Sequence, residues 1–166
     1  MKILGIDAST RVVGWAFSND DVISDAGFID ISKTETNKEK CFCVISLLKD
    51  KIDDTHHINL EAPLLGFGFG KSSQQTIIKL IKFNGLLEYL LSEEFKISVN
   101  LINVNTARKK VIGMARIKGI SSKELVKQEL PKIVTDLFRF DVLNKKGKVD
   151  KRIEDVRDAI IMSLYE

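Results

Sequence analysis

Two apolar runs in this sequence each end in a carboxylate. Residues 2–7 read KILGID and residues 56–61 read HHINLE, and both have the composition of buried strands. Pro63 stops strand pairing just beyond Glu61, so this acid is expected at a sheet edge beside a loop. A lone buried carboxylate costs several kcal/mol unless it is paired or bound to a cation. Asp7 and Glu61 are therefore predicted to share a cation.

The rest of the chain predicts an α/β fold with the element order β-β-β-α-β-α-β-α. The first three strands are expected to follow one another directly, and the later strands to alternate with helices that cross back over the sheet. Ser121 and Glu124 have the spacing of a capping box, and Asn105 is predicted to start a short helix. The expected strands are 2–7, 12–18, 22–31, 56–61 and 97–104, with helices over 36–53, from Ser72 or Ser73 to about Glu94, and from near Arg152.

A second pair of acids lies on the last predicted helix, RIEDVRDAIIMSLY. Asp155 and Asp158 are three residues apart, so they share one helix face and can point at a common ion. The opposite face is apolar, which predicts a helix that is substantially buried. Their mutual repulsion grows when they are desolvated, and a divalent cation would relieve it. The apolar stripe consists of Ile153, Val156, Ile160 and Leu164.

Each of these acids alone reads as an ordinary surface or capping carboxylate, but the four together predict a metal site. Oxygen ligands without cysteine or histidine favour Mg²⁺, with Mn²⁺ able to substitute. A carboxylate cluster of this kind suits two ions that activate water and stabilise the leaving oxygen of a phosphodiester. The predicted ligands and catalytic acids are Asp7, Glu61, Asp155 and Asp158.

Charge is distributed unevenly along the 166 residues, which suit a single domain spanning 1–166. Residues 105–152 contain 14 Lys and Arg against five Asp and Glu, a net charge of +9, so the rest carries −6 of the total +3. A basic half suits phosphate binding, although a merely well-solvated surface explains it equally well. The chain has neither an 18-residue apolar run nor a signal-peptide pattern, so a cytoplasmic protein without membrane contact is expected.

Three segments resemble the RuvC-type Holliday junction resolvases. LGIDASTRVVGWAF closely resembles their opening motif, INLEAPL looks like their second motif, and EDVRDAIIMSLY resembles their closing helix. The resemblance runs from residue 2 to 165 in the family's order. It implies a ribonuclease H-like fold with a mixed five-stranded sheet flanked by helices, a homodimer, and Mg²⁺-dependent paired nicking of four-way DNA junctions. The family's four metal-binding acids map onto the same four residues.

Basic residues before the closing helix assist at the scissile phosphate in related resolvases. Arg108, in TARKKVIG, and Lys123, in SSKELV, occupy similar positions, although Lys is usual at the first. The stretch MARIKGI between them resembles an insertion of a few residues. Other basic residues are therefore candidates for the same role or for DNA contacts, namely Lys109, Lys110, Arg116 and Lys118.

The segment GFGFGKSS follows Glu61 closely and combines glycine with aromatic rings. Phe67 and Phe69 are predicted to stack on unpaired bases, and Lys71 to meet a phosphate. Family members place an aromatic residue sooner after the glutamate, where this chain has Leu64. The alternative is that both rings pack on the following helix.

Other classes share part of this pattern. Sugar kinases and actin-like ATPases also open with GID-x-S/T, but they need two such domains and about twice the chain. YqgF-type nucleases share the first motif but lack a glutamate like Glu61 in such a context. A broader branched-DNA endonuclease and an inactive junction-binding module also remain open. The helix from about Ser73 to Glu94 is the candidate dimer interface, because its Leu and Ile content exceeds what one sheet face needs. Its expected apolar side comprises Ile77, Leu80, Ile81, Leu86, Leu87 and Leu90.

Overall fold

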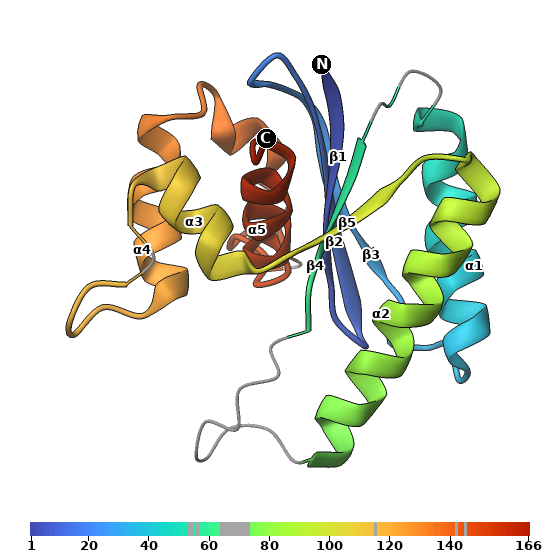
Figure 1. Cartoon of the computed structure of the whole chain (residues 1–166). Coiled ribbons are helices and arrows are strands. Elements are labelled where there is room, and N and C mark those ends of the chain that lie inside the picture. The colour runs from blue at the N-terminus through green and yellow to red at the C-terminus, as the bar shows by residue number, and fades with distance from the viewer. Residues whose placement is uncertain (53–54, 56, 64–73, 115, 142, 145) are drawn as a thin grey trace.

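Five strands form one mixed sheet in the computed structural model of the chain, which describes residues 1–52, 55, 57–63, 74–114, 116–141, 143–144 and 146–166 (Figure 1). The spatial order is β3-β2-β1-β4-β5. The first three strands are antiparallel neighbours, whereas β4 and β5 run parallel to β1. The strands are β1 (Lys2–Ala8), β2 (Val12–Asn19), β3 (Val22–Asp30), β4 (His57–Glu61) and β5 (Val99–Ile102).

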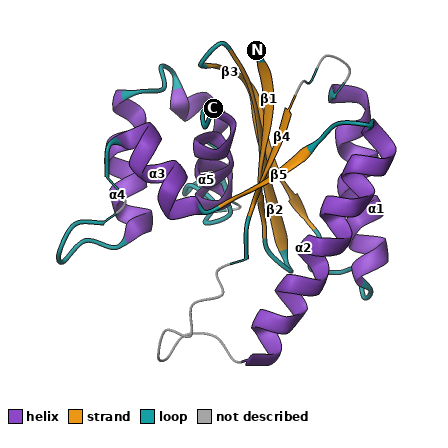
Figure 2. Ribbon diagram, in the orientation of Figure 1, coloured by secondary structure: helices purple, strands orange, loops and turns teal. Residues whose placement is uncertain are grey.

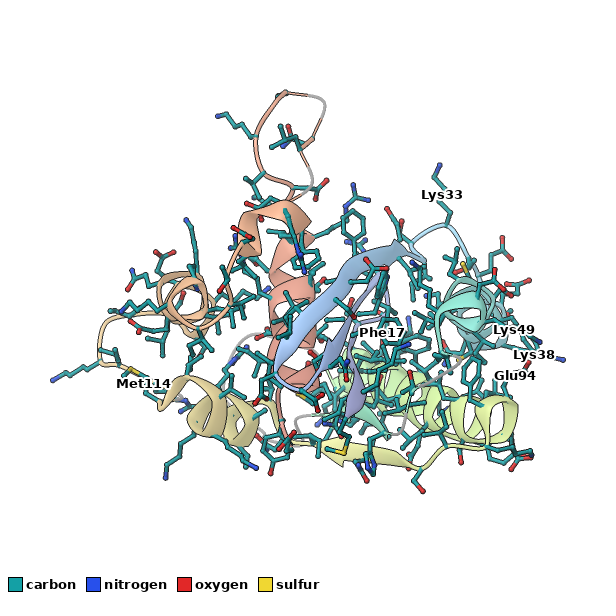
Figure 3. The ribbon with its side chains drawn as sticks, turned by 90° about the horizontal axis from the view of Figure 1, so that it is seen from above. Phe17, Lys33, Lys38, Lys49, Glu94 and Met114 are labelled. Atoms are coloured by element: carbon teal, nitrogen blue, oxygen red, sulfur yellow. The ribbon has the colours of Figure 1, made fainter. Side chains whose placement is uncertain are left out.

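Helices cover both faces of this sheet, so the molecule has three layers (Figure 2). On one face lie α1 (Asn37–Leu48) and α2 (Gln74–Phe95), joined near one end by an ion pair of 2.6 Å between Lys49 and Glu94, which Figure 3 shows side by side. On the other face lie α3 (Val104–Ile112), α4 (Ser122–Glu129) and α5 (Ile153–Ser163) (Figure 1). Short 3-10 turns complete the described elements at Lys49–Lys51, Leu130–Lys132 and Leu137–Phe140. The α/β class and the mixed five-stranded sheet are confirmed.

The apolar core is divided by the sheet into two clusters. Leu4 and Ile6 of β1 belong to the cluster under α1 and α2, whereas Ala16 of β2 belongs to the cluster under α5. Because side chains alternate along a strand, the residues between Leu4, Ile6 and Ala8 face α5. Asp7 is one of these, so the pleat itself turns this acid toward the helix that carries Asp155 and Asp158.

Helix α5 is buried around most of its circumference, as the sequence predicts. Besides Ile153, Val156 and Ile160, the side chains of Ala159, Ile161 and Met162 are inaccessible or nearly so. Leu164 follows the last helical residue and is only half-buried, so the predicted stripe ends one turn earlier.

Two expected boundaries and one expected face are wrong. Helix α3 begins at Val104 rather than Asn105, because the side chain of Asn103 accepts a hydrogen bond from the backbone N–H of Asn105 and caps the helix. This cap shortens β5 to Val99–Ile102. On α2 the buried face comprises Phe83, Asn84, Leu87 and Leu91, whereas Ile81, expected on the apolar side, is 39% exposed.

Two glycines allow α5 to lie directly on the backbone of the sheet. A Cβ atom on Gly14 of β2 would be 2.1 Å from the carbonyl oxygen of Asp155, and one on Gly5 of β1 would be 2.2 Å from that of Ala159. Real Cβ atoms do not approach backbone this closely, so any larger residue would push the helix away.

No helix among the described residues is long and apolar enough to cross a membrane.

Replacing Gly14 with alanine should destabilise the protein, because the added methyl group meets helix backbone that cannot move aside without shifting α5. Overpacking of this kind lowers the free energy of unfolding by about 1–3 kcal/mol. Urea denaturation measures this loss. Ser46→Ala is the control, since Ser46 lies at an exposed position of α1. That variant should keep or slightly raise the free energy of unfolding, because alanine has the higher helix propensity; equal stability of the two variants would contradict the close approach.

Candidate active site

The strand register brings Asp7 and Glu61 together. Asp7 is the second-last residue of β1, and β4 pairs with β1 in parallel with Ile6 opposite Leu60, so the next residue of each strand is an acid. Asn59 of β4 donates through its side chain to the carbonyl oxygen of Met162 in α5, which shows that alternate residues of β4 face that helix. Glu61, two residues later, faces the same side, and its carboxyl lies within hydrogen-bonding reach of Asp7.

The close approach at Gly14 adds the second pair of acids. Gly14 is the direct neighbour of Asp7 across the β1–β2 ladder, and the backbone of Asp155 lies on it. Asp158, one helical turn further, faces the sheet and is 6% exposed. Four acids from three segments far apart in the sequence therefore lie near one another at one end of the sheet.

Burial and mutual repulsion disfavour the ionised form of these acids. Burial raises the pKa of Asp7 well above its usual range, and the neighbouring negative charge of Glu61 raises it further. The pKa of Asp155 rises to about 6 because it is buried, although Lys123 opposes the rise. Burial also raises the pKa values of Glu61 and Asp158. A bound cation would offset this repulsion and favour the ionised form of the four acids.

Arg108 neutralises one of the four acids. Its Nη2 atom donates to Oδ1 and Oδ2 of Asp158 at 2.8 and 2.7 Å, and its Nε atom donates to Oδ1 at 3.2 Å. Both side chains are 8% exposed. A guanidinium that contacts both carboxylate oxygens fixes the orientation of the carboxylate. The predicted basic residue is thus at the site, where it holds an acid.

Lys123, the second predicted basic residue, reaches the site from the start of α4. Its Nζ atom lies 2.8 Å from Oε2 of Glu154, and the two side chains are 55% and 42% exposed. Its positive charge acts on Glu61, Asp155 and Asp158 and opposes the rise of their pKa values. Exposed ion pairs contribute little to stability, so Lys123 can leave Glu154 at small cost.

Asn84 of α2 is a site residue that the sequence analysis missed. Its Nδ2 atom donates to the backbone carbonyl of Glu61 at 3.0 Å, and its side chain is almost completely buried. Its Oδ1 atom is buried without a hydrogen-bond partner among the described residues. A polar residue between Phe83 and Leu87 on the buried face of a helix was the available signal.

The four acids fit a divalent cation in donor chemistry and in charge. All their donors are carboxylate oxygens, which Mg²⁺ and Mn²⁺ prefer, and a bound cation would remove the repulsion that raises their pKa values. As the side chains lie, however, no three acidic, histidine or cysteine residues among those described are grouped tightly enough to hold one ion. Metal binding would therefore require a carboxylate to turn.

Comparison with solved structures identifies the same fold in other proteins. RuvC of Thermus thermophilus in complex with a Holliday junction substrate superimposes with a TM-score of 0.66 at 13% identity, covering 99% of this chain and 91% of that one. The Thermus thermophilus RuvC structure gives 0.62 at 13% identity, covering 99% and 92%. The yeast mitochondrial Holliday junction resolvase gives 0.65 at 16% identity, covering 98% and 76%.

This chain has the RuvC fold. At these identities the likeness establishes the ribonuclease H-like architecture, and it extends over nearly the whole chain. No family model matches the sequence, and no curated protein does either. The roles of individual residues in this RuvC-like chain therefore depend on its own geometry.

The predicted DNA-binding residues of the RuvC-like chain lie in three different settings. Lys109, Arg116 and Lys118 are exposed, the first on α3 and the other two on the segment 116–121, which projects toward the lower left of Figure 1. Lys110 is engaged with the end of the chain, over the ring of Tyr165 and against the carbonyl oxygen of Glu166. The predictions for Phe67, Phe69 and Lys71 lie outside the described residues, as does the capping prediction for Ser72 and Ser73.

The raised pKa of Asp155 predicts that its contribution to stability falls as pH rises. An unfolded Asp has a pKa near 3.9, against about 6 in the fold, so between these values the folded protein retains a proton that the unfolded chain has lost. In EDTA, Asp155→Asn should therefore lose less of its melting temperature than the wild type between about pH 5 and pH 8. Asp21→Asn, in an exposed turn, should behave like the wild type. An equal loss in all three proteins would contradict the shift.

Proposed function

We propose that this protein is a Mg²⁺-dependent endonuclease that resolves four-way DNA junctions by paired, symmetric nicks. The observation that carries the proposal is the meeting of Asp7, Glu61, Asp155 and Asp158 at one end of the sheet. Support comes from the shared fold with RuvC, of which one similar structure is in complex with a Holliday junction substrate. Mn²⁺ should substitute for Mg²⁺, because it accepts the same oxygen ligands.

The metal, when bound, would supply positive charge that activates water and stabilises the leaving oxygen of the phosphodiester. Asp7 and Glu61 would hold it from the rigid strand ends, and Asp155 and Asp158 from the buried helix. Such supports keep ligands in place better than loops do. Lys123 is exposed beside these acids and is weakly tethered, so it is the basic residue best able to contact the scissile phosphate.

DNA would approach the end of the sheet where β1 and β4 end. Lys109, Arg116 and Lys118 are exposed and form no ion pair with any part of the chain that the structure describes. Unpaired cations on a projecting segment are suited to contact phosphates along a branch. Met114, which Figure 3 shows where the chain leaves α3 on the side away from the sheet, is 36% exposed beside them.

Cleavage assays with four-way junction, flap and linear duplex DNA test this function. With Mg²⁺, the wild type should cut the junction in preference to the other two. Asp7→Asn should lower the rate by at least about 100-fold, the loss typical of a group that stabilises transition-state charge.

Asp21→Asn is the matched control, since it makes the same change in an exposed turn and should leave cutting unchanged. Comparable cutting of flaps and junctions would favour the broader branched-DNA endonuclease. Junction binding without any cutting would favour the inactive binding module, and equal cutting by wild type and Asp7→Asn would reject the metal site.

Paired nicking requires two copies of the site, and we propose that α2 joins them. Ile78, Ile81 and Tyr89 are 51%, 39% and 61% exposed and lie along one side of this helix, with Gly85 between them. Large apolar side chains on one helix face indicate a protein contact, and a two-fold axis lets the same face meet itself.

Ile81→Glu should convert a dimer to a monomer, because two buried carboxylates would face each other across the axis. Light scattering during gel filtration measures the mass. Val22→Glu, which places the same charge on an apolar residue that is 67% exposed in the β2–β3 hairpin, should stay dimeric. A dimeric Ile81→Glu protein would place the interface elsewhere.

A further inference from the structure

Asp158 has a cation as its partner, whereas the other predicted metal ligands have none among the described residues. Arg108 contacts both oxygens of its carboxylate at 2.7 and 2.8 Å with one nitrogen, and approaches Oδ1 at 3.2 Å with another. The two other pairings near the site leave the predicted ligands alone, since Lys123 contacts Glu154, and Asn84 contacts only the backbone of Glu61. Asp158 is therefore held differently from the other acids.

Burial makes this ion pair hard to share. Each partner is 8% exposed, so neither side chain can exchange the contact for water without leaving the interior. Arg108 lies on the buried face of α3 with Val104, Ala107 and Ile112, and this packing fixes where its guanidinium can reach. A planar guanidinium bound to both oxygens also sets the direction in which the carboxylate faces.

The positions of the four acids agree with an Asp158 carboxylate that is held by Arg108. No three acids among the described residues are close enough to hold one ion, although the charges of all four act on one another. A metal that has Asp158 among its ligands must share this carboxylate with Arg108 or displace the guanidinium from it.

We propose that Arg108 and the divalent metal compete for Asp158. Arg108 is then a positioning residue that acts as the counter-ion of this carboxylate, and metal loading displaces its guanidinium. The inference rests on the proposed metal site. The inference gives the two basic residues different roles. The buried Arg108 affects metal binding at Asp158, whereas the exposed Lys123 remains available to contact DNA.

Calorimetric titration of the whole protein with Mn²⁺ in the absence of DNA tests the competition. Arg108→Met removes the competing cation, so Mn²⁺ should bind on the order of tenfold tighter than in the wild type, as expected for two partners in direct contact. The same variant should melt at a lower temperature in EDTA, because Asp158 is left buried without a counter-ion. Mn²⁺ should therefore raise its melting temperature more than it raises that of the wild type.

Lys109→Met is the matched control, since it removes one positive charge from the same helix at an exposed position. Its Mn²⁺ affinity should stay within about twofold of the wild type, because exposed charges are screened. Arg108→Lys keeps the charge but loses the two-oxygen contact, and it should bind Mn²⁺ more tightly than the wild type even if Arg108→Met does not fold.

Unchanged or weaker Mn²⁺ binding in the Arg108 variants would overturn the inference, because a residue that only supports its ligand loses metal affinity when it is removed. That result would leave the proposed nuclease intact, provided that the wild type binds Mn²⁺. Failure of the wild type and of every variant to bind Mn²⁺ would overturn the metal-dependent function and the inference together.

Discussion

The approach of α5 to the backbone of β1 and β2 determines the geometry of the site. At Gly5 and Gly14 there is no room for a side chain between helix and sheet, so the helix is set by backbone contact rather than by adaptable side chains. Gly14 is also the ladder neighbour of Asp7. One contact therefore fixes the helix on the sheet and places Asp155 beside Asp7. Gly14 lies in LGIDASTRVVGWAF, the segment that resembles the opening motif of the resolvases, and this close approach is the physical reason for a glycine there.

The same packing brings the acids close together and buries them, and nearby positive side chains partly offset the resulting repulsion. Acids brought together at a buried end of the sheet are desolvated and repel one another, which raises their pKa values. One buried and one exposed basic side chain favour the ionised form of these acids. Arg108 is enclosed with Asp158, whereas Lys123 is more than half exposed and pairs with Glu154. Because the cost of breaking a pair depends on its burial, two basic residues that look equivalent in the sequence acquire different tasks.

The sequence predicts most of the fold and the acids of the site, because both depend on local patterns. Asp7 and Glu61 follow apolar runs, Asp155 and Asp158 follow helical spacing, and the structure brings all four together. The partner of Arg108 depends on a contact between residues 50 positions apart, which no local pattern gives. One signal was nevertheless present: Val104, Ala107 and Ile112 place Arg108, and not its two lysine neighbours, on the apolar side of α3.

The two faces of α2 link the site to the proposed dimer. Its buried face presents Asn84 to the backbone of Glu61, so the end of β4 is held by this helix as well as by its strand neighbours. Its exposed face carries Ile78, Ile81 and Tyr89, the apolar residues expected to meet a second subunit. Asn84 keeps one buried oxygen without a partner among the described residues, which leaves this contact dependent on a single hydrogen bond. A helix fixed by its partner would hold that bond more firmly than a helix free on one side. Dimerisation through α2 would thus stabilise the strand end that carries Glu61 in both subunits, which would suit the proposed paired nicking.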